Sequence, residues 1–358
     1  MSDRHTASPA EGSYYPWFDW LRGGLAVMVM VAHDGLVPWS NAGPFAVEVF
    51  FALSGWLIGG VLLHTRREHL RRFYFNRAVR IWVPYYIALT LLLLASLRAD
   101  AITPKWLEFV LYKAAFVYNL FGTQQLAGYA AQMPLGGTGN HFWSVNAEEQ
   151  FYLIAPLLLV LAAARWGRST LSWIVLAGLA WALDGYSSIV FGVCAAVIAS
   201  NHPGVLQRGA SRVALGLVGV GAALGLAAGG PYALLAPWIA ICIVLLLAVP
   251  GRKMRLGVLV GGLSYPLYLN HWIGVFVANA ITRPFGLRES PLSHTISFAF
   301  NIALALGLYV FVERPLLARR STWYTPAIGA RATIAAYAMM GCGLLLGLGY
   351  ALVRIGRA

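Results

Sequence analysis

The sequence predicts an all-α, polytopic integral membrane helix bundle of about 11 transmembrane helices with one additional interfacial or re-entrant segment. Hydrophobic residues make up 59% of the 358 residues and charged residues only 11%, and the mean hydropathy is +0.68. Soluble domains keep about 25% charged residues to cover their surface, so we expect nearly all of this chain to be embedded. Apolar stretches of about 20 residues, the length that crosses the hydrocarbon core, recur along it.

The apolar stretches follow one another in order and define the predicted spans. Two of them, 170–186 and 187–201, are short and are joined tightly near Gly185. A further apolar stretch, 105–121, is interrupted by charged residues and is the interfacial or re-entrant candidate. The spans are predicted at residues 18–38, 44–64, 80–98, 147–164, 170–186, 187–201, 213–229, 232–250, 256–280, 295–317 and 332–352.

Basic residues orient these spans. The second span ends in HTRREHLRRFYFNRAVR, which contains six arginines and is a strong cytoplasmic signal. The later basic junctions all fall on the cytoplasmic side only if residues 105–121 do not cross the membrane. We therefore expect residues 99–142 to lie outside, with the N-terminus cytoplasmic and the C-terminus outside. The net charge of +13 then reflects cytoplasmic loops of a protein in the cytoplasmic (inner) cell membrane, rather than nucleic-acid binding.

The domain organisation follows from the same pattern. Residues 1–17 are polar and lack the apolar core of a signal peptide, so we interpret them as a cytoplasmic tail. Residues 18–320 form a ten-span core, and residues 321–358 contain an additional transmembrane helix. Glycines spaced four apart within apolar stretches indicate close helix packing; the pairs are Gly55/Gly59, Gly221/Gly225 and Gly343/Gly347.

The cysteines and the motif inventory predict neither a disulfide framework nor a metal site. Cys194, Cys242 and Cys342 each lie inside apolar stretches, where buried thiols are expected. No HExxH motif and no paired CxxC motif occurs in the sequence.

Two ionisable residues stand in the first span. Arg22 and His33 are eleven positions apart, about three helical turns and a rise of about 16 Å, so they share one helix face. Asp19 lies one turn before Arg22 and is a possible partner for it. Arg22 snorkelling to the inner headgroups is an even alternative, and a lone buried histidine is usually bonded to a neighbouring helix.

Other polar residues are predicted at the same, outer depth. Glu48 begins the second span, where its carboxylate can orient the His33 imidazole. His271 lies 16 residues beyond the cytoplasmic Arg255. The segment GNHFWSVNAEEQFYLIAP adds His141, Trp143, Glu148 and Glu149. Asn146 with Glu149 fits a capping box, and Trp143 fits an aromatic belt. Ionisable groups inside membranes indicate function, and both proton-coupled transporters and acid–base enzymes use them.

Six blocks of the sequence, in order and across nearly the whole chain, resemble the integral-membrane acyltransferase 3 family. DWLRGGLAVMVMVAH is similar to its D-x-L-R-G…H signature, and AVEVFFALSGWLI to its G-V-D-x-F-F-x-x-S-G-F-x-I block, with Glu48 in place of the usual Asp. The other four similar segments are NRAVRIWVPYY, FWSVNAEEQFYL, LSYPLYLNHW and VERPL.

The resemblance implies acyl transfer from a cytoplasmic acyl-CoA, usually acetyl-CoA, to a hydroxyl of a sugar or a glycosylated acceptor. It also implies a core of ten spans, with an eleventh in members that carry an extracellular esterase-like domain. The sequence ends at Ala358, so we expect no such second domain to complete the transfer.

On this basis each candidate residue receives a role in an O-acetyltransferase that modifies polysaccharides. We expect His33 to act as general base with Glu48 or Glu148 orienting it, and Arg22 to guide the donor. Arg77 and Arg80 at the cytoplasmic mouth are expected to pair with the donor's phosphates, although cytoplasmic basicity alone also explains them. The expected acceptor-binding residues are His141, Trp143, Tyr268 and His271.

Two other interpretations stay open from the sequence. A proton-coupled multi-pass transporter or exporter would use the same His, Arg and Glu residues. A structural partner of an export complex would need them only to satisfy one another. The acceptor stays open among exopolysaccharide, O-antigen, glucan, lipid-linked sugar and a secreted small molecule, and the sequence predicts no particular oligomeric state.

Overall fold

The computed structural model describes residues 14–161 and 164–355, and every regular element in those ranges is helical. Among them, the helices long and apolar enough to cross a membrane are Ala42–His64, Arg67–Ala99, Gly209–Ala227, Pro291–Trp323 and Pro326–Arg354. Shorter apolar helices are Thr170–Ala182, Ser187–Asn201 and Tyr232–Leu247. The all-helical prediction is confirmed, whereas the predicted count of about 11 spans is not. Most of the predicted 1–17 tail lies outside the described residues.

The chain divides into two compact units. The first comprises the chain up to residue 67 and residues 155–264, and the second comprises residues 68–154 and 265–358. The first holds α1 (Pro16–His33), α2 (Ala42–His64), α9 (Thr170–Ala182), α10 (Ser187–Asn201), α11 (Gly209–Ala227) and α12 (Tyr232–Leu247). The second holds α3 (Leu70–Ala99), α4 (Pro104–Ala114), α5 (Tyr118–Phe121), α14 (Pro291–Leu308), α15 (Arg314–Trp323) and α16 (Pro326–Ile355). The unit boundaries at 154/155 and 264/265 fall within α7 (Phe142–Pro156) and α13 (Arg255–Thr282).

Helix α1 is shorter than predicted. The apolar pattern predicts a span to residue 38, but the helix ends at His33. Gly35 adopts a left-handed conformation with φ of 72°, which glycine reaches at little cost and which terminates helices. The backbone N–H of Asp34 still bonds to the carbonyl of Met30. His33 therefore lies at the end of the helix.

The stretch 105–121 does not form one continuous helix. Helix α4 has 11 residues and α5 has four. Phe116 breaks them apart with φ of 55°. Neither is long enough to cross a bilayer, which takes about 20 residues, in keeping with the predicted interfacial or re-entrant placement.

Glycines bring α2 and α10 together in the first unit. A Cβ on Gly55 would lie 2.1 Å from the carbonyl oxygen of Ile189, and one on Gly192 would lie 2.3 Å from the carbonyl oxygen of Ala52. Only residues without a side chain allow this approach. The packing role predicted for Gly55 is confirmed.

Of the other two glycine pairs, one packs closely as predicted and one does not do so at both positions. In α16, a Cβ on Gly347 would lie 2.3 Å from the Phe121 ring, and one on Gly343 would lie 2.6 Å from Ala115, so this pair packs as predicted. Gly221 has nothing within 4 Å of its Cβ position, so the prediction is wrong there. Cys194 and Cys242 are buried as expected, but Cys342 is exposed on α16.

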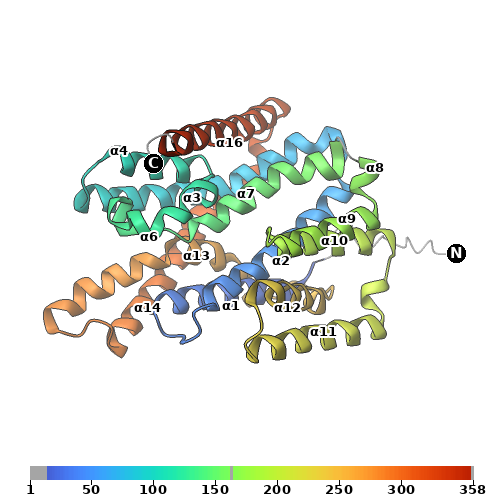
Figure 1. Ribbon diagram of the computed structural model, residues 1–358, viewed down its shortest axis with the longest axis horizontal. Helices are drawn as coiled ribbons and strands as arrows, with labels where there is room; N and C mark the ends of the chain where they lie inside the picture. Colours follow the sequence, from blue (N-terminus) through green and yellow to red (C-terminus); the bar gives the residue numbers. More distant parts are fainter. Residues whose placement is uncertain (1–13, 162–163, 356–358) are drawn as a thin grey trace. The chain divides into compact units, whose positions relative to one another are not determined.

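An aromatic core holds α3, α4 and α7 in the second unit. Tyr85 of α3 is fully buried, and its hydroxyl donates to the carbonyl of Lys113 at 2.8 Å. Its ring lies 4.6 Å from Phe116 and 5.3 Å from Phe142, centroid to centroid. Helix α16 packs along α3 (Figure 1), and Arg354 forms an ion pair with Glu108 of α4 at 2.9 Å.

Candidate functional site

His33, the last residue of α1, is exposed, and its ring orientation is set by the helix itself. Its Nδ1 lies 2.9 Å from the carbonyl oxygen of Val29. A carbonyl only accepts, so Nδ1 carries the proton in the neutral ring and Nε2 carries the lone pair. The ring also lies beside the start of α2, where a Cβ on Gly43 would be 3.9 Å from Cε1. The helix therefore holds the imidazole in the tautomer that makes Nε2 the basic atom.

Arg22 pairs with Asp19, as its position one turn later predicts. The Nη1–Oδ1 distance is 3.4 Å. The hydroxyl of Tyr14 donates to the other carboxylate oxygen of Asp19. Close packing surrounds this pair, since a Cβ on Gly23 would lie 2.2 Å from Val260 of α13, and one on Gly261 would lie 2.7 Å from Asp19 Oδ1. The arginine is thus anchored on its own helix.

Glu48 is half-buried in α2 and is held by α10. The hydroxyl of Ser188 donates to its Oε2. This bond fixes the carboxylate two helical turns from the start of α2.

Pro84 shapes the segment that carries Arg77 and Arg80. Pro84 lies inside α3, where it removes the N–H that would bond to the Arg80 carbonyl and opens the helix locally. The hydroxyl of Tyr265 donates to the neighbouring carbonyl of Ile81 at 3.2 Å. Arg77 is half-buried between the rings of Phe73 and Tyr152, 5.9 and 5.6 Å from its Cζ, and its Nε has no hydrogen-bond partner among the described residues.

Arginines from two helices converge at this end of the second unit. Arg72 and Arg80 of α3 act electrostatically on Arg320 of α15, and α15 packs on α3. Within the described part of the chain, no carboxylate forms an ion pair with any of the three. Neighbouring positive charges favour the binding of an anion, and Arg80 also acts electrostatically on the Glu313 carboxyl. The sequence shows that these positions are basic but not that they converge.

Helix α7 carries two adjacent carboxylates in different settings. Glu148 is half-buried and accepts a hydrogen bond from the Tyr152 hydroxyl. Glu149 is 3% exposed, and its Oε1 accepts a 2.8 Å bond from Trp82 Nε1. Its Oε2 is buried without a partner among the residues described. The sequence pattern predicts a helix cap, not a functional role, for Glu149.

The predicted capping box is wrong. Helix α7 begins at Phe142, so Asn146 and Glu149 lie inside the helix. The side-chain oxygen of Asn146 accepts from the backbone N–H of Tyr118, and its NH₂ donates to Tyr85 and to the Phe142 carbonyl. Glu149 is therefore a buried carboxylate rather than a helix cap.

Three of the four predicted acceptor residues form one buried cluster. The rings of His141 and His271 lie 4.5 Å apart, and the Tyr268 ring is 5.6 Å from His141. The Tyr268 hydroxyl donates to the His141 carbonyl at 2.9 Å. His141 and His271 are 6% and 2% exposed. Trp143 is half-buried and lies two residues after His141 in the sequence.

Each histidine of this cluster is fixed by a backbone carbonyl. His141 Nε2 lies 3.2 Å from the Leu269 carbonyl, and His271 Nδ1 lies 2.8 Å from the Tyr268 carbonyl. Asn301 of α14 then binds the backbone around His271, donating to its carbonyl at 2.7 Å and accepting from Gly274 N at 2.9 Å.

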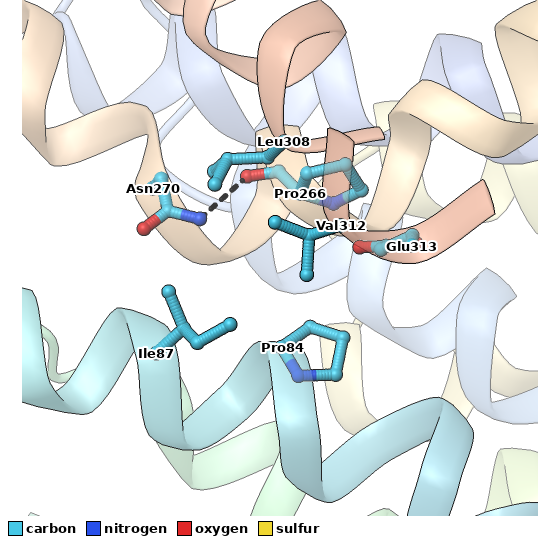
Figure 2. A pocket seen from close by; sticks show the side chains of 7 residues that line it. All are labelled: Pro84, Ile87, Pro266, Asn270, Leu308, Val312 and Glu313. Atoms are coloured by element: carbon cyan, nitrogen blue, oxygen red, sulfur yellow. Dashed lines mark hydrogen bonds between the residues drawn. The ribbon is translucent and has the colours of Figure 1, made fainter. Parts of the chain in front are cut away.

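A small pocket opens between α3, α13 and the π-helical turn Tyr309–Glu313 (Figure 2). The π-helical turn directly precedes Pro315 at the start of α15, and the missing proline N–H explains why the regular helix gives way there. Figure 2 shows Asn270 and Glu313 on opposite sides of the pocket. Its other lining residues are aliphatic: Pro84, Ile87, Pro266, Leu308 and Val312.

A comparison with protein families finds a match to the acyltransferase domain over residues 15–310. The chain belongs to the acyltransferase 3 family. The matched residues include the α1, α2, α3, α7 and α13 segments whose sequence blocks resemble this family.

Curated relatives of this acyltransferase chain include O-acetyltransferases. It is 29% identical to the peptidoglycan O-acetyltransferase OatA of Listeria monocytogenes over 161 residues, 41% of this chain and 24% of that protein. It is 30% identical to the putative peptidoglycan O-acetyltransferase YrhL of Bacillus subtilis over the same shares. The alignments thus span about a quarter of these two relatives.

A third relative aligns over most of its length. The putative membrane-bound transacylase BcsY of Komagataeibacter xylinus is 26% identical over 322 residues, 83% of this chain and 81% of that protein. No solved structure matches the chain.

The predicted site residues lie on several helices. His33 and Arg22 come from α1, Glu48 from α2, and Arg77 and Arg80 from α3. Glu313, in the E-x-P block, lines the pocket of Figure 2. In the described residues, no group of three or more His, Cys, Asp or Glu could hold a metal ion.

Proposed function

We propose that the chain is a membrane O-acyltransferase that moves an acyl group, most simply acetyl, from acyl-CoA to a hydroxyl of a carbohydrate or glycosylated acceptor. The observation that carries this proposal is the 2.9 Å contact between His33 Nδ1 and the Val29 carbonyl. In the neutral ring it leaves the lone pair on Nε2, the atom that a general base uses.

In the proposed reaction, His33 Nε2 takes the proton of the acceptor hydroxyl. The acceptor oxygen attacks the thioester carbonyl, and the C–S bond breaks as the new C–O ester bond forms. The CoA sulfur leaves as a thiolate and receives the proton from the imidazolium. Glu48, held by Ser188, and Glu148 are the candidates to orient the imidazole.

The donor's phosphates are assigned to the arginines. Arg72 and Arg80 act electrostatically on Arg320, and none of the three forms an ion pair with a carboxylate among the described residues. Arg77 Nε is buried without a hydrogen bond there. Guanidinium groups bind phosphate oxygens with paired N–H donors. Arg22 would guide the donor toward His33, about 16 Å further along α1. The positive-inside rule explains basic residues at this end but not their convergence from two helices.

The topology and acceptor are part of the same proposal. We place the chain in the cytoplasmic membrane as a bundle of about 11 spans with a cytoplasmic N-terminus, so that acyl-CoA reaches the arginines from inside. The names of the O-acetyltransferase relatives support a glycan hydroxyl as acceptor. His141, Trp143, Tyr268 and His271 are the proposed acceptor-binding residues.

A direct test is acyl transfer by the purified chain in liposomes supplied with acetyl-labelled acetyl-CoA and glycan acceptors. We expect release of free CoA thiol that depends on the acceptor, with label recovered as an alkali-labile ester. A proton-coupled transporter would instead show solute flux driven by a pH gradient and no release of thiol. That second pattern would contradict the proposal.

A further inference from the structure

Helix α16 lies outside the residues that match the acyltransferase domain, yet it packs closely on residues 104–140, the connecting segment between α3 and α7. A Cβ on Gly343 would lie 2.6 Å from the side chain of Ala115. A Cβ on Gly347 would lie 2.3 Å from the Phe121 ring. The two glycines of α16 therefore let the helix approach the connecting segment as closely as its backbone allows.

The end of α16 is tied to the same segment by charge. Arg354 Nη1 lies 2.9 Å from Glu108 Oε1, and Lys105 Nζ lies 2.9 Å from Glu108 Oε2. The Tyr112 hydroxyl also donates to Oε1, at 2.8 Å. Because the Glu108 side chain is only 6% exposed, water and salt screen these contacts little. Glu108 thus joins α16 to α4 through one buried carboxylate.

The connecting segment transmits this bracing to the start of α7. Lys113 Nζ of α4 donates to the Gly139 carbonyl at 2.8 Å. The Tyr118 hydroxyl of α5 donates to Asn140 Oδ1 at 2.9 Å. His141, whose ring belongs to the buried histidine cluster, is the next residue. The two residues before His141 are therefore held by the two short helices on which α16 packs.

The rest of α16 shows that its contacts are confined to one side. Leu345 and Leu352 are 73% and 69% exposed, whereas Gly343, Gly347 and Arg354 meet the connecting segment. A helix that only anchored the chain in lipid would need neither small residues at a protein contact nor an arginine paired with a buried carboxylate. The pattern favours a helix that holds a particular part of the protein.

We propose that α16 is a positioning element for the acceptor site: through Gly347 and the Arg354–Glu108 ion pair it holds the connecting segment in the conformation that places His141. Glu108 and Arg354 are positioning residues, because they act on the acceptor through the backbone before His141 and not by contact. This inference rests on the proposed function, in which His141 binds the acceptor.

Kinetics of variants reconstituted in liposomes test this role. In Gly347→Leu, whose side chain would collide with Phe121, we expect the KM for the glycan acceptor to rise about threefold to tenfold, the effect of losing one neutral hydrogen bond, with the KM for acetyl-CoA unchanged. Gly349→Leu is the matched control, since nothing lies within 4 Å of a Cβ at Gly349.

The ion pair is tested in the same assay. Arg354→Gln should raise the acceptor KM as Gly347→Leu does, and Arg354→Lys, which keeps the charge, should restore most of the wild-type value. Arg331→Gln makes the same change at an exposed position of α16 and should leave both KM values unchanged. If Gly347→Leu misfolds, Arg354→Gln decides.

Amide hydrogen exchange gives a readout that does not depend on activity. Gly347→Leu and Arg354→Gln should speed exchange in residues 104–141, whereas Gly349→Leu should not. Folded variants with an unchanged acceptor KM, an equal rise in both KM values, or unchanged exchange in residues 104–141 would each show that the inference is wrong while the proposed function stands. A wild-type protein that transfers no acyl group would overturn the proposed function and, with it, the acceptor role of α16.

Discussion

His33 Nδ1 of α1 lies 2.9 Å from the Val29 carbonyl, one helical turn earlier. His64, at the end of α2, makes the same contact with the Gly60 carbonyl, also at 2.9 Å. Both histidines end a helix, both are exposed, and both have their tautomer set by their own backbone. They differ in sequence context, since His33 follows an arginine at eleven residues and His64 does not. This makes His64 a matched control for His33.

Glu48 is expected to act through His33. Glu48→Gln should lower kcat by at least about tenfold, because removing the charge of an orienting carboxylate weakens the base. Glu48→Asp, the residue usual in the resembled family block, should restore most of the rate. The measurement is kcat against pH, in which an orienting role shifts the profile. A uniform loss of folded protein without a change in the pH profile would indicate a structural role.

The converging arginines are expected to bind the donor. Arg80→Ala and Arg320→Ala should each raise the KM for acetyl-CoA by about tenfold or more, since a hydrogen bond to a charged group contributes roughly 1.5–3 kcal/mol. Arg208→Ala removes an exposed arginine from a predicted cytoplasmic junction and should change KM little. Equal effects in all three variants would mean that overall basicity, not a phosphate site, is responsible.

Lys113 is expected to make the stability of the second unit depend on pH. Its side chain in α4 is fully buried, with Nζ 2.8 Å from the Gly139 carbonyl and 3.5 Å from the Tyr118 ring centroid. Burial lowers the pKa of Lys113 to about 7. The unfolded chain then binds more protons between pH 7 and the ordinary lysine pKa, so the free energy of unfolding should rise with pH across that window, by at most about 1.4 kcal/mol per unit.

Denaturation in detergent at pH 7 to 10 measures this effect. Lys113→Met should remove this part of the pH dependence, whereas Lys105→Met should keep it, because Lys105 is paired with Glu108 at 2.9 Å. An identical pH slope in wild type and Lys113→Met would refute the assignment.

Asn301 is expected to stabilise the histidine cluster. It is 1% exposed and bonds to the His271 carbonyl and to Gly274 N. Asn301→Leu removes both hydrogen bonds from buried backbone groups of α13, at a cost of about 0.5–1.5 kcal/mol each in unfolding free energy. Asn201→Leu removes two hydrogen bonds from an exposed asparagine and should cost much less. Thermal unfolding of both variants compares them, and equal losses would contradict the prediction.

The sequence predicts helices well because apolar stretches dictate them. The predicted 187–201 coincides with α10, and the Asp19–Arg22 pair follows directly from helical spacing. Sequence reasoning fails where local backbone geometry decides where a helix ends or how it is capped. Gly35 ends α1 five residues early, and the side chain of Asn146 binds the Tyr118 N–H instead of capping α7.

Convergence of residues from distant segments escapes sequence reasoning for a different reason. Arg320 joins Arg72 and Arg80 only because α15 packs on α3. Asn270 and Glu313 line one pocket through the π-helical turn before Pro315. No periodic pattern in the sequence predicts either of these two contacts. Pro315 was the one signal available in the sequence for the π-helical turn, since a proline inside a long apolar stretch marks a place where regular helix is interrupted.

The central claim is that His33 removes the acceptor's proton. The most direct measurement is the initial rate of acetyl-ester formation by wild type, His33→Ala and His64→Ala, reconstituted at equal folded amounts with acetyl-CoA and a glycan acceptor. We predict a loss of at least about a hundredfold for His33→Ala, with His64→Ala close to wild type and acetyl-CoA binding retained in both. A His33→Ala protein that forms ester at the wild-type rate would contradict the account.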